Sequence, residues 1–97
     1  MNFDEKANYV IEGIMLNYRA NGGTKKRIAF QKDEFKPTWW PQNRWDWATA
    51  KHFRVENTYP GPGTLGSFLT DCIHLILQGD YFIPWSYYLA SSNLNLG

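Results

Sequence analysis

Apolar residues recur at steps of three and four over two stretches of the chain, with an irregular segment between them. The period is that of an amphipathic α-helix. Asp4 and Glu5 favour an amino-terminal end for the first helix, and Asn21-Gly22-Gly23 is a typical stop. We therefore expect a helix from Asp4 to Arg19. Its apolar face consists of Phe3, Ala7, Val10, Ile11, Ile14 and Tyr18.

The second periodic stretch follows Thr64, a residue whose hydroxyl can accept a hydrogen bond from a backbone N–H of the first helical turn. The pattern predicts a helix that runs to about Gln78 and ends at Gly79. Polar residues lie largely on the other side of this helix. Its apolar stripe consists of Leu65, Phe68, Leu69, Cys72, Ile73 and Ile76.

The segment between the two helices, residues 24–62, has no long helical period. It holds four of the five prolines and four of the five tryptophans. Lys26 to Phe30 could form one short strand. Residues Asp46 to Phe53 favour a helix of about two turns, with Asp46 as its N-cap.

The last segment is apolar at residues 81–89, which we expect to pack on the core as an extended piece bent at Pro84. We expect the residues after Ala90 to fray. The whole chain is thus predicted to be one mostly α-helical domain, residues 1–97. Two long amphipathic helices and one short helix would surround a Trp-rich, Pro-containing irregular middle.

The composition supports a folded core. Of the 97 residues, 43% are hydrophobic and seventeen are aromatic, which gives enough burial to offset the entropy of the chain. The single cysteine, Cys72, excludes an intrachain disulfide and fits a reducing compartment. No apolar run reaches the roughly 20 residues that cross a bilayer, so we expect no membrane segment.

No pattern of acidic, basic and nucleophilic residues predicts catalysis. Ser67, Asp71 and His74 share one helix face, but parallel side chains do not converge on one reacting atom. Gly61-Pro62-Gly63 lacks the Lys and Ser/Thr of a phosphate loop, and proline removes an amide donor. We therefore expect no enzyme, no cofactor and no metal site.

The charge is unevenly distributed, although its total is only +1. Residues 19–54 carry nine basic side chains against three acidic ones, a net +6, whereas residues 1–18 carry −2 and residues 55–97 carry −3. Such a concentration is typical of phosphate-binding proteins, and a solvated basic loop would give the same pattern. The nine are Arg19, Lys25, Lys26, Arg27, Lys32, Lys36, Arg44, Lys51 and Arg54.

The string Lys36-Pro37-Thr38-Trp39-Trp40-Pro41 resembles the K-P-x-W-W-P signature of the nuclear respiratory factor / erect wing family of transcription factors. It is also similar to a string in vertnin-like nuclear proteins. The flanking segments Met15-Leu16-Asn17-Tyr18 and Trp47-Ala48-Thr49-Ala50-Lys51 resemble the family's M-L-K-Y and W-A-N-V-R. The apolar stripe of the second helix resembles its L-x-x-I-V-x-x-C-Y. The resemblance covers about residues 10–78 and concerns the C-terminal half of the family's DNA-binding domain.

The resemblance implies a nuclear, helical, non-enzymatic transcriptional regulator, because family members bind GC-rich palindromic DNA as homodimers. Double-stranded DNA and a possible homodimer are thus the expected partners. Trp39 and Trp40 would build the core, since Pro37 and Pro41 stiffen the chain around them. Core residues on the second helix would be Leu65, Phe68, Leu69, Cys72 and Ile73.

Basic residues around the signature would then contact the DNA. We expect Lys25, Lys26, Arg27 and Lys36 to contact phosphates. Arg44, Lys51 and Arg54 flank or lie on the predicted short helix and could reach a groove, where an arginine can pair with guanine. The alternative is a protein-interaction module of a nuclear or chromatin-associated complex, with Trp45 exposed on an aromatic surface.

Overall fold

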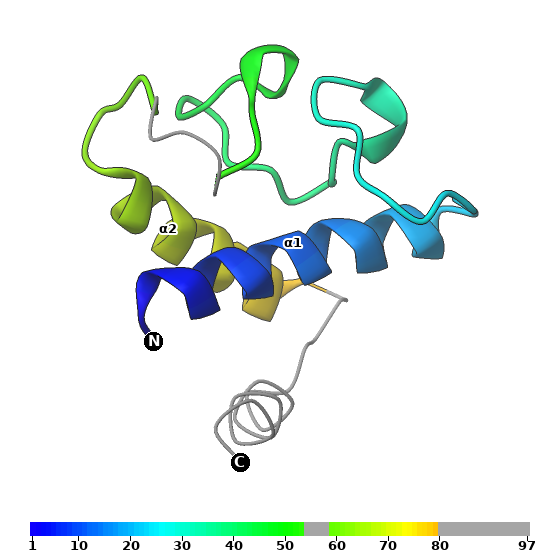
Figure 1. The fold of residues 1–97 in the computed structure, drawn as a ribbon, viewed down its shortest axis with the longest axis horizontal. Helices are drawn as coiled ribbons and strands as arrows, with labels where there is room; N and C mark the ends of the chain where they lie inside the picture. Colours follow the sequence, from blue (N-terminus) through cyan, green and yellow to red (C-terminus); the bar gives the residue numbers. More distant parts are fainter. Residues whose placement is uncertain (54–58, 80–97) are drawn as a thin grey trace.

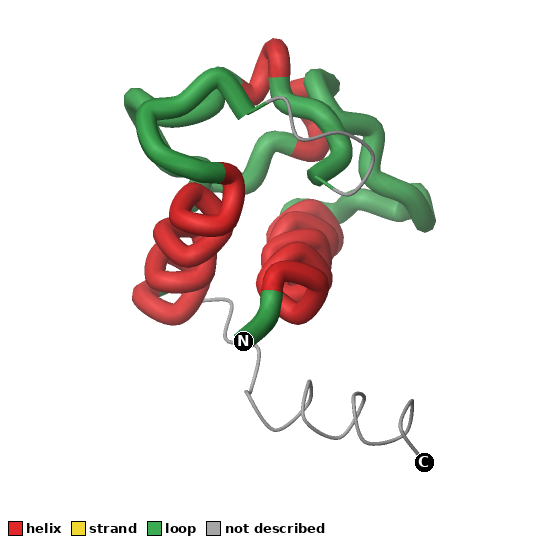
Figure 2. Tube along the Cα trace, turned by 60° about the vertical axis from the view of Figure 1, so that its left-hand side comes forward, coloured by secondary structure: helices red, strands yellow, loops and turns green. Residues whose placement is uncertain are grey.

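The computed structural model describes residues 1–53 and 59–79, in which two α-helices form the base (Figure 1). These are α1 (Phe3–Ala20) and α2 (Leu65–Gln78), and they pack against each other. An irregular layer lies over both helices (Figure 2) and contains two short 3-10 turns, η1 (Asp33–Phe35) and η2 (Trp47–Thr49). These described ranges contain no β-strand. The mostly α-helical class predicted from the sequence is confirmed.

The first helix begins and ends within a residue of its predicted bounds. Asn2 caps it, because its side chain accepts from the Glu5 N–H at 2.9 Å while the Glu5 carboxylate accepts from the Asn2 N–H at 3.0 Å. Gly22, at φ 90°, carries the chain away from the helix axis. Phe3 was expected on the buried face but is 41% exposed, because it starts the helix, where few residues pack on it. Buried side chains of α1 include Ala7, Tyr9, Val10, Ile14, Met15 and Tyr18.

The second helix is capped as the sequence predicts. Thr64 accepts from the Ser67 N–H at 3.1 Å, and the Ser67 hydroxyl accepts from the Thr64 N–H at 3.2 Å. Close packing against α1 depends on Gly13, because a Cβ atom there would lie 2.5 Å from the Ile76 side chain. Leu65, Phe68, Leu69, Cys72 and Ile76 are buried, and Ile73 packs at the edge of this core.

Tryptophans of the irregular layer close the core from above. Trp40 packs edge-on against Phe68 of α2 at 5.3 Å between ring centroids, and against Trp47 at 4.9 Å. Trp45 is buried beside Phe68 as well, so the expectation that it is exposed is wrong. Its ring packs edge-on against Phe68 of α2 and against Tyr59. Trp39 is half-buried and packs against this core.

Two elements predicted for the middle segment differ in the structure. Residues 26–30 do not form a strand: Ile28 and Phe30 instead pack their side chains on the core, and Gln31 turns the chain at φ 75°. The short helix is one 3-10 turn rather than two α-helical turns. Its cap is as expected, since Asp46 accepts from the Ala48 N–H at 3.2 Å. The chain becomes extended at Ala50.

Several predictions concern residues outside the described ranges. They are the position of Arg54, the packing of residues 81–89 and the fraying after residue 90. Within residues 1–53 and 59–79, no helix is long and apolar enough to cross a membrane.

Candidate nucleic-acid interface

The basic residues of the middle segment are mostly exposed. They follow α1 and continue through the irregular layer (Figure 1), where Lys25 forms an ion pair with Glu34 at 3.0 Å. Apart from Lys25 and the half-buried Arg44, these basic residues have no carboxylate partner among the residues that the structure describes. Their charge is therefore available to an external anion. The exposed residues are Arg19, Lys25, Lys26, Arg27, Lys32, Lys36 and Lys51.

Tyr18 positions the loop that carries Lys25, Lys26 and Arg27. Its hydroxyl accepts from the backbone N–H of Thr24 at 3.1 Å and of Lys25 at 2.9 Å. Its ring stacks on Phe35 at 4.1 Å between centroids. The carboxylate of Glu34 raises the pKa of Lys25 through a hydrogen bond and its charge. The start of this basic loop is thus held against the end of α1.

Lys36 is held by the signature string that it begins. Pro37 is fully buried, whereas Lys36 beside it is exposed. Thr38 accepts a hydrogen bond at 2.9 Å from the side chain of Asn17, the one buried polar residue of the described core. This contact joins the string to α1 and fixes the backbone next to Lys36.

Lys32 and Lys51 come from two segments that lie side by side. The indole N–H of Trp47 donates to the carbonyl oxygen of Lys32 at 2.9 Å. The side chain of Gln31 donates to the carbonyl oxygen of Ala50 at 3.2 Å. Hydrogen bonds to buried neighbours thus place both lysines on one part of the irregular layer.

Arg44, like Lys25, has partners inside the domain, and it has more of them. Its Nε donates to the Tyr59 hydroxyl at 2.7 Å, and Nη1 forms an ion pair with Asp71 of α2. The guanidinium carbon lies 5.6 Å from the ring centroids of both Tyr59 and Phe68. Its side chain is only 19% exposed. Arg44 therefore connects the irregular layer to α2 and to the segment before it.

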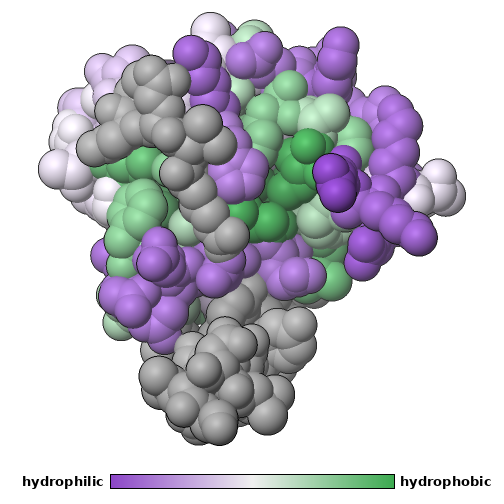
Figure 3. Space-filling view, in the orientation of Figure 1, coloured by the Kyte–Doolittle hydropathy of each residue, from purple (hydrophilic) through white to green (hydrophobic). Residues whose placement is uncertain are grey.

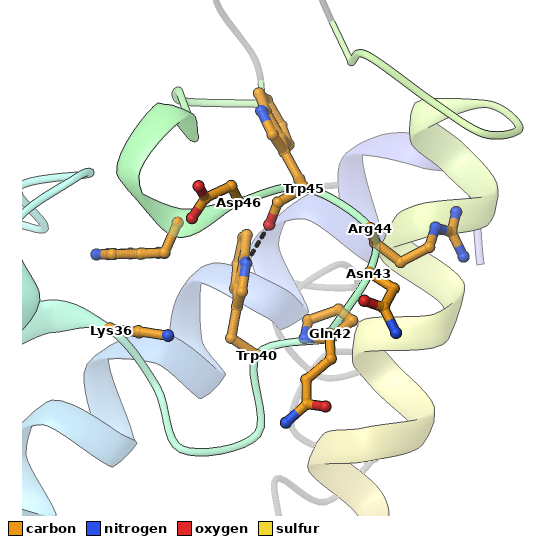
Figure 4. Close-up of a pocket in the computed structure, with 9 residues that line it drawn as sticks. Lys36, Trp40, Gln42, Asn43, Arg44, Trp45 and Asp46 are labelled. Carbon is orange, nitrogen blue, oxygen red and sulfur yellow. Dashed lines mark hydrogen bonds between the residues drawn. The ribbon is translucent and has the colours of Figure 1, made fainter.

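A polar hollow of about 360 Å³ lies beside Arg44 (Figure 4). Its inner side is lined by the tryptophan cluster, which consists of Trp40, Trp45 and Trp47. The polar residues that line it are Lys36, Gln42, Asn43 and Asp46. The indole N–H of Trp40 donates to the carbonyl oxygen of Trp45, which shapes its inner wall. The Gln42 and Asn43 side chains point away from the cluster (Figure 4) and are exposed. Sequence reasoning missed these two amides because neither belongs to a charged or periodic pattern.

Charge is separated along the long axis of α1. Asp4 and Glu5 lie in its first turn and Arg19 in its last, a separation of about 21–23 Å for a helix of this rise. The basic loop follows directly after Arg19. Figure 3 shows hydrophilic side chains along the right-hand side of the molecule, where α1 ends, and an apolar area nearer the centre. Arg19 and the basic loop thus lie at the end of α1 that is opposite to Asp4 and Glu5.

Two of the three residues that were considered for catalysis on one face of α2 have structural contacts, and the third, His74, is exposed. Asp71 is paired with Arg44, and Ser67 belongs to the cap of α2. Burial raises the pKa of the Cys72 thiol, which keeps it protonated and unreactive at neutral pH. Among residues 1–53 and 59–79 there is no group of three or more His, Cys, Asp or Glu that could hold a metal ion.

The signature string lies at the junction of α1, η1 and the tryptophan cluster. Pro37, Trp40 and Pro41 are buried there. No protein-family model, curated protein or solved structure matches the chain. The likeness of residues 36–41 to the nuclear respiratory factor / erect wing signature therefore depends on those residues and their flanks.

Proposed function

We propose that this domain binds double-stranded DNA in the nucleus, as part of a transcriptional regulator, through the exposed cations of residues 19–51. The observation that carries the proposal is a set of six exposed Lys and Arg side chains that have no carboxylate partner in the described part of the chain. Duplex DNA has a high density of phosphate charge, and its release of counterions favours such cations.

The proposal assigns different tasks to these residues. Lys26, Arg27 and Lys36 contact phosphates, together with Lys25, which exchanges its pairing with Glu34 for the DNA. Lys51, two residues after η2, is exposed and is the described candidate for a groove contact. The family resemblance makes a GC-rich duplex the first sequence to test and a homodimer the first stoichiometry.

Arg44 has a positioning task in this proposal instead of a direct base contact. Its guanidinium is engaged by Tyr59 and Asp71. It holds the loop that presents Gln42 and Asn43. Arg54 is outside the described residues, so its expected groove contact remains a prediction from the sequence.

The alternative, a protein-interaction module that uses an aromatic surface, is less well supported. Trp40, Trp45 and Trp47 are each less than 8% exposed. These rings are buried in the core and leave little exposed aromatic surface for a partner to contact. Basic residues outnumber acidic ones among the exposed charged residues of the described middle segment, which favours DNA over an aromatic-mediated partner.

Substitution of the basic loop tests the proposal. We expect Lys26→Ala combined with Arg27→Ala to weaken binding to a GC-rich duplex by roughly tenfold or more, because two phosphate contacts are lost. Fluorescence anisotropy of a labelled duplex at about 50 mM salt measures this. Lys6→Ala, which removes one charge from the other end of α1, is the matched control for the single substitution Lys26→Ala and should change the affinity far less than that variant does. Equal effects of the two variants would contradict the proposed location.

A further inference from the structure

An apolar groove of about 320 Å³ lies between α1 and the segment that follows the basic loop. Ile11 and Met15 form the wall on the side of α1, and Ile28 forms the opposite wall. Lys26, Arg27 and His52 complete the lining. In Figure 3, apolar side chains reach the surface above α1 with hydrophilic side chains next to them.

The groove exposes apolar surface that the domain's own described residues leave uncovered. Ile11 and Ile28 are half-buried, so part of each side chain faces solvent. Contiguous apolar surface with a polar border is typical of a protein-binding site. A ligand that fills this groove must therefore carry at least one large apolar side chain.

The border of the groove defines the charge of that ligand. Lys26 and Arg27 are exposed and have no carboxylate partner among the described residues. Among residues 1–53 and 59–79, no acidic side chain lines the groove. A partner that placed Lys or Arg here would meet like charge, whereas one with Asp or Glu gains complementary pairing and faster association. Apolar walls and cationic borders together select an acidic, partly apolar chain.

We propose that this groove binds an acidic peptide segment of another protein, with a large apolar side chain between Ile11 and Ile28 and carboxylates beside Lys26 and Arg27. Such recognition combines burial of an apolar anchor with charge pairing at the border. DNA supplies the negative charge but lacks a large apolar side chain to insert. The inference goes beyond DNA binding and does not depend on it. Because both ligands use Lys26 and Arg27, they compete for this end of the domain.

The proposal is tested with a synthetic probe and NMR of the full chain. The probe is a peptide of about 12 residues that combines Asp and Glu with Leu and Phe, and its control keeps every carboxylate but replaces Leu and Phe with Ser. We expect the probe to shift the methyl resonances of Ile11, Met15 and Ile28, with those of Leu77 on α2 unchanged. The control peptide should bind at least about fivefold more weakly.

Variants separate the apolar contribution from the charge. Ile28→Gln should weaken the probe at least about fivefold without changing duplex DNA binding at the same salt, because it keeps both cations. Leu77→Gln, at a residue that is 45% exposed on α2, is the matched control and should leave the probe's affinity unchanged. Arg27→Gln should weaken both the probe and the duplex.

Other outcomes would overturn the inference. Equal affinity for the probe and the serine control would mean that charge alone attracts the peptide. If duplex DNA shifted the methyl resonances of the groove, and if Ile28→Gln weakened the affinity for that duplex, the groove would be part of the DNA interface. The chain could instead self-associate through the groove. If both Ile28→Gln and Phe3→Ser, at the exposed acidic end of α1, abolished self-association, the occupant would be a second copy of this chain.

Discussion

At the scale of single residues, Arg44 differs most from what the sequence indicates. The sequence predicts that this basic residue, next to Trp45 in a positively charged segment, contacts DNA. In the structure it reaches Tyr59 and Asp71, which are 15 and 27 positions away. Local sequence carries no signal for such pairs, because they form only when the irregular layer folds over α2. The Thr64 cap of α2 is local and could be predicted from a few neighbouring residues.

Arg44→Ala should therefore lower the stability of the domain. The substitution removes a hydrogen bond to Tyr59 and leaves the Asp71 carboxylate unpaired on α2. We expect a loss of about 1–2 kcal/mol in the free energy of unfolding, measured by urea denaturation. Lys51→Ala removes the same charge from an exposed site and should change stability by less than about 0.5 kcal/mol. Identical urea midpoints for Arg44→Ala and the wild type would contradict the assigned role.

Gly13→Ala tests the close approach of the two helices. The added Cβ would lie 2.5 Å from Ile76 Cδ1 and 3.0 Å from Cγ1, and this side chain is fully buried and has no room to move away. We expect a destabilisation of about 1–3 kcal/mol, despite the better helix propensity of alanine. Gly66→Ala in α2 meets only the Thr64 hydroxyl at 3.9 Å and should be neutral or stabilising by up to about 1 kcal/mol. A thermal melt in which both substitutions behave alike would show that the helices do not approach this closely.

At the scale of elements, periodicity together with the acidic start and glycine stop of α1 and the Thr64 cap of α2 was enough to predict both helices, whereas the Asn2 cap of α1 was not predicted. Both helices combine a one-sided apolar stripe with a capping residue, so local and long-range preferences agree. The middle segment lacks this agreement. Residues 26–30 contain side chains that favour a strand, but the described residues contain no partner strand. Residues 46–53 contain residues that favour a helix, but Trp47 and Phe53 in this segment are buried in the core. Tertiary packing therefore decides their conformation, and only the Asp46 cap was predictable.

The cap of α2 provides the prediction at this scale. Thr64→Ala removes the acceptor for the Ser67 N–H and leaves the first turn of the helix without its capping box. We expect a loss of about 1 kcal/mol in the free energy of unfolding. Thr64→Ser keeps the hydroxyl and should retain most of the stability. Chemical denaturation of the three proteins checks the order, and a Thr64→Ser variant as unstable as Thr64→Ala would show that the hydroxyl is not the cause.

At the scale of the whole molecule, the small net charge conceals a strong separation of charge. Acidic residues lie at the start of α1, and most basic residues follow its end. The uneven distribution was visible in the sequence, but which cations are free was not. In the structure, Arg44 pairs with Asp71 and Lys25 pairs with Glu34. Six other basic residues are exposed and have no carboxylate partner in the part of the chain that the structure describes. The surface that we propose for DNA is therefore narrower than the run of basic residues suggests.

The dependence of duplex binding on salt tests the central proposal most directly. Each phosphate contact contributes about −0.9 to the slope of log K against log[salt]. If Lys25, Lys26, Arg27 and Lys36 each contact a phosphate, the wild-type slope for a GC-rich duplex should be about −3.6, and Lys26→Ala combined with Arg27→Ala should reduce its magnitude by about 1.8. The absence of binding at about 50 mM salt, or a slope that the double substitution leaves unchanged, would contradict the account.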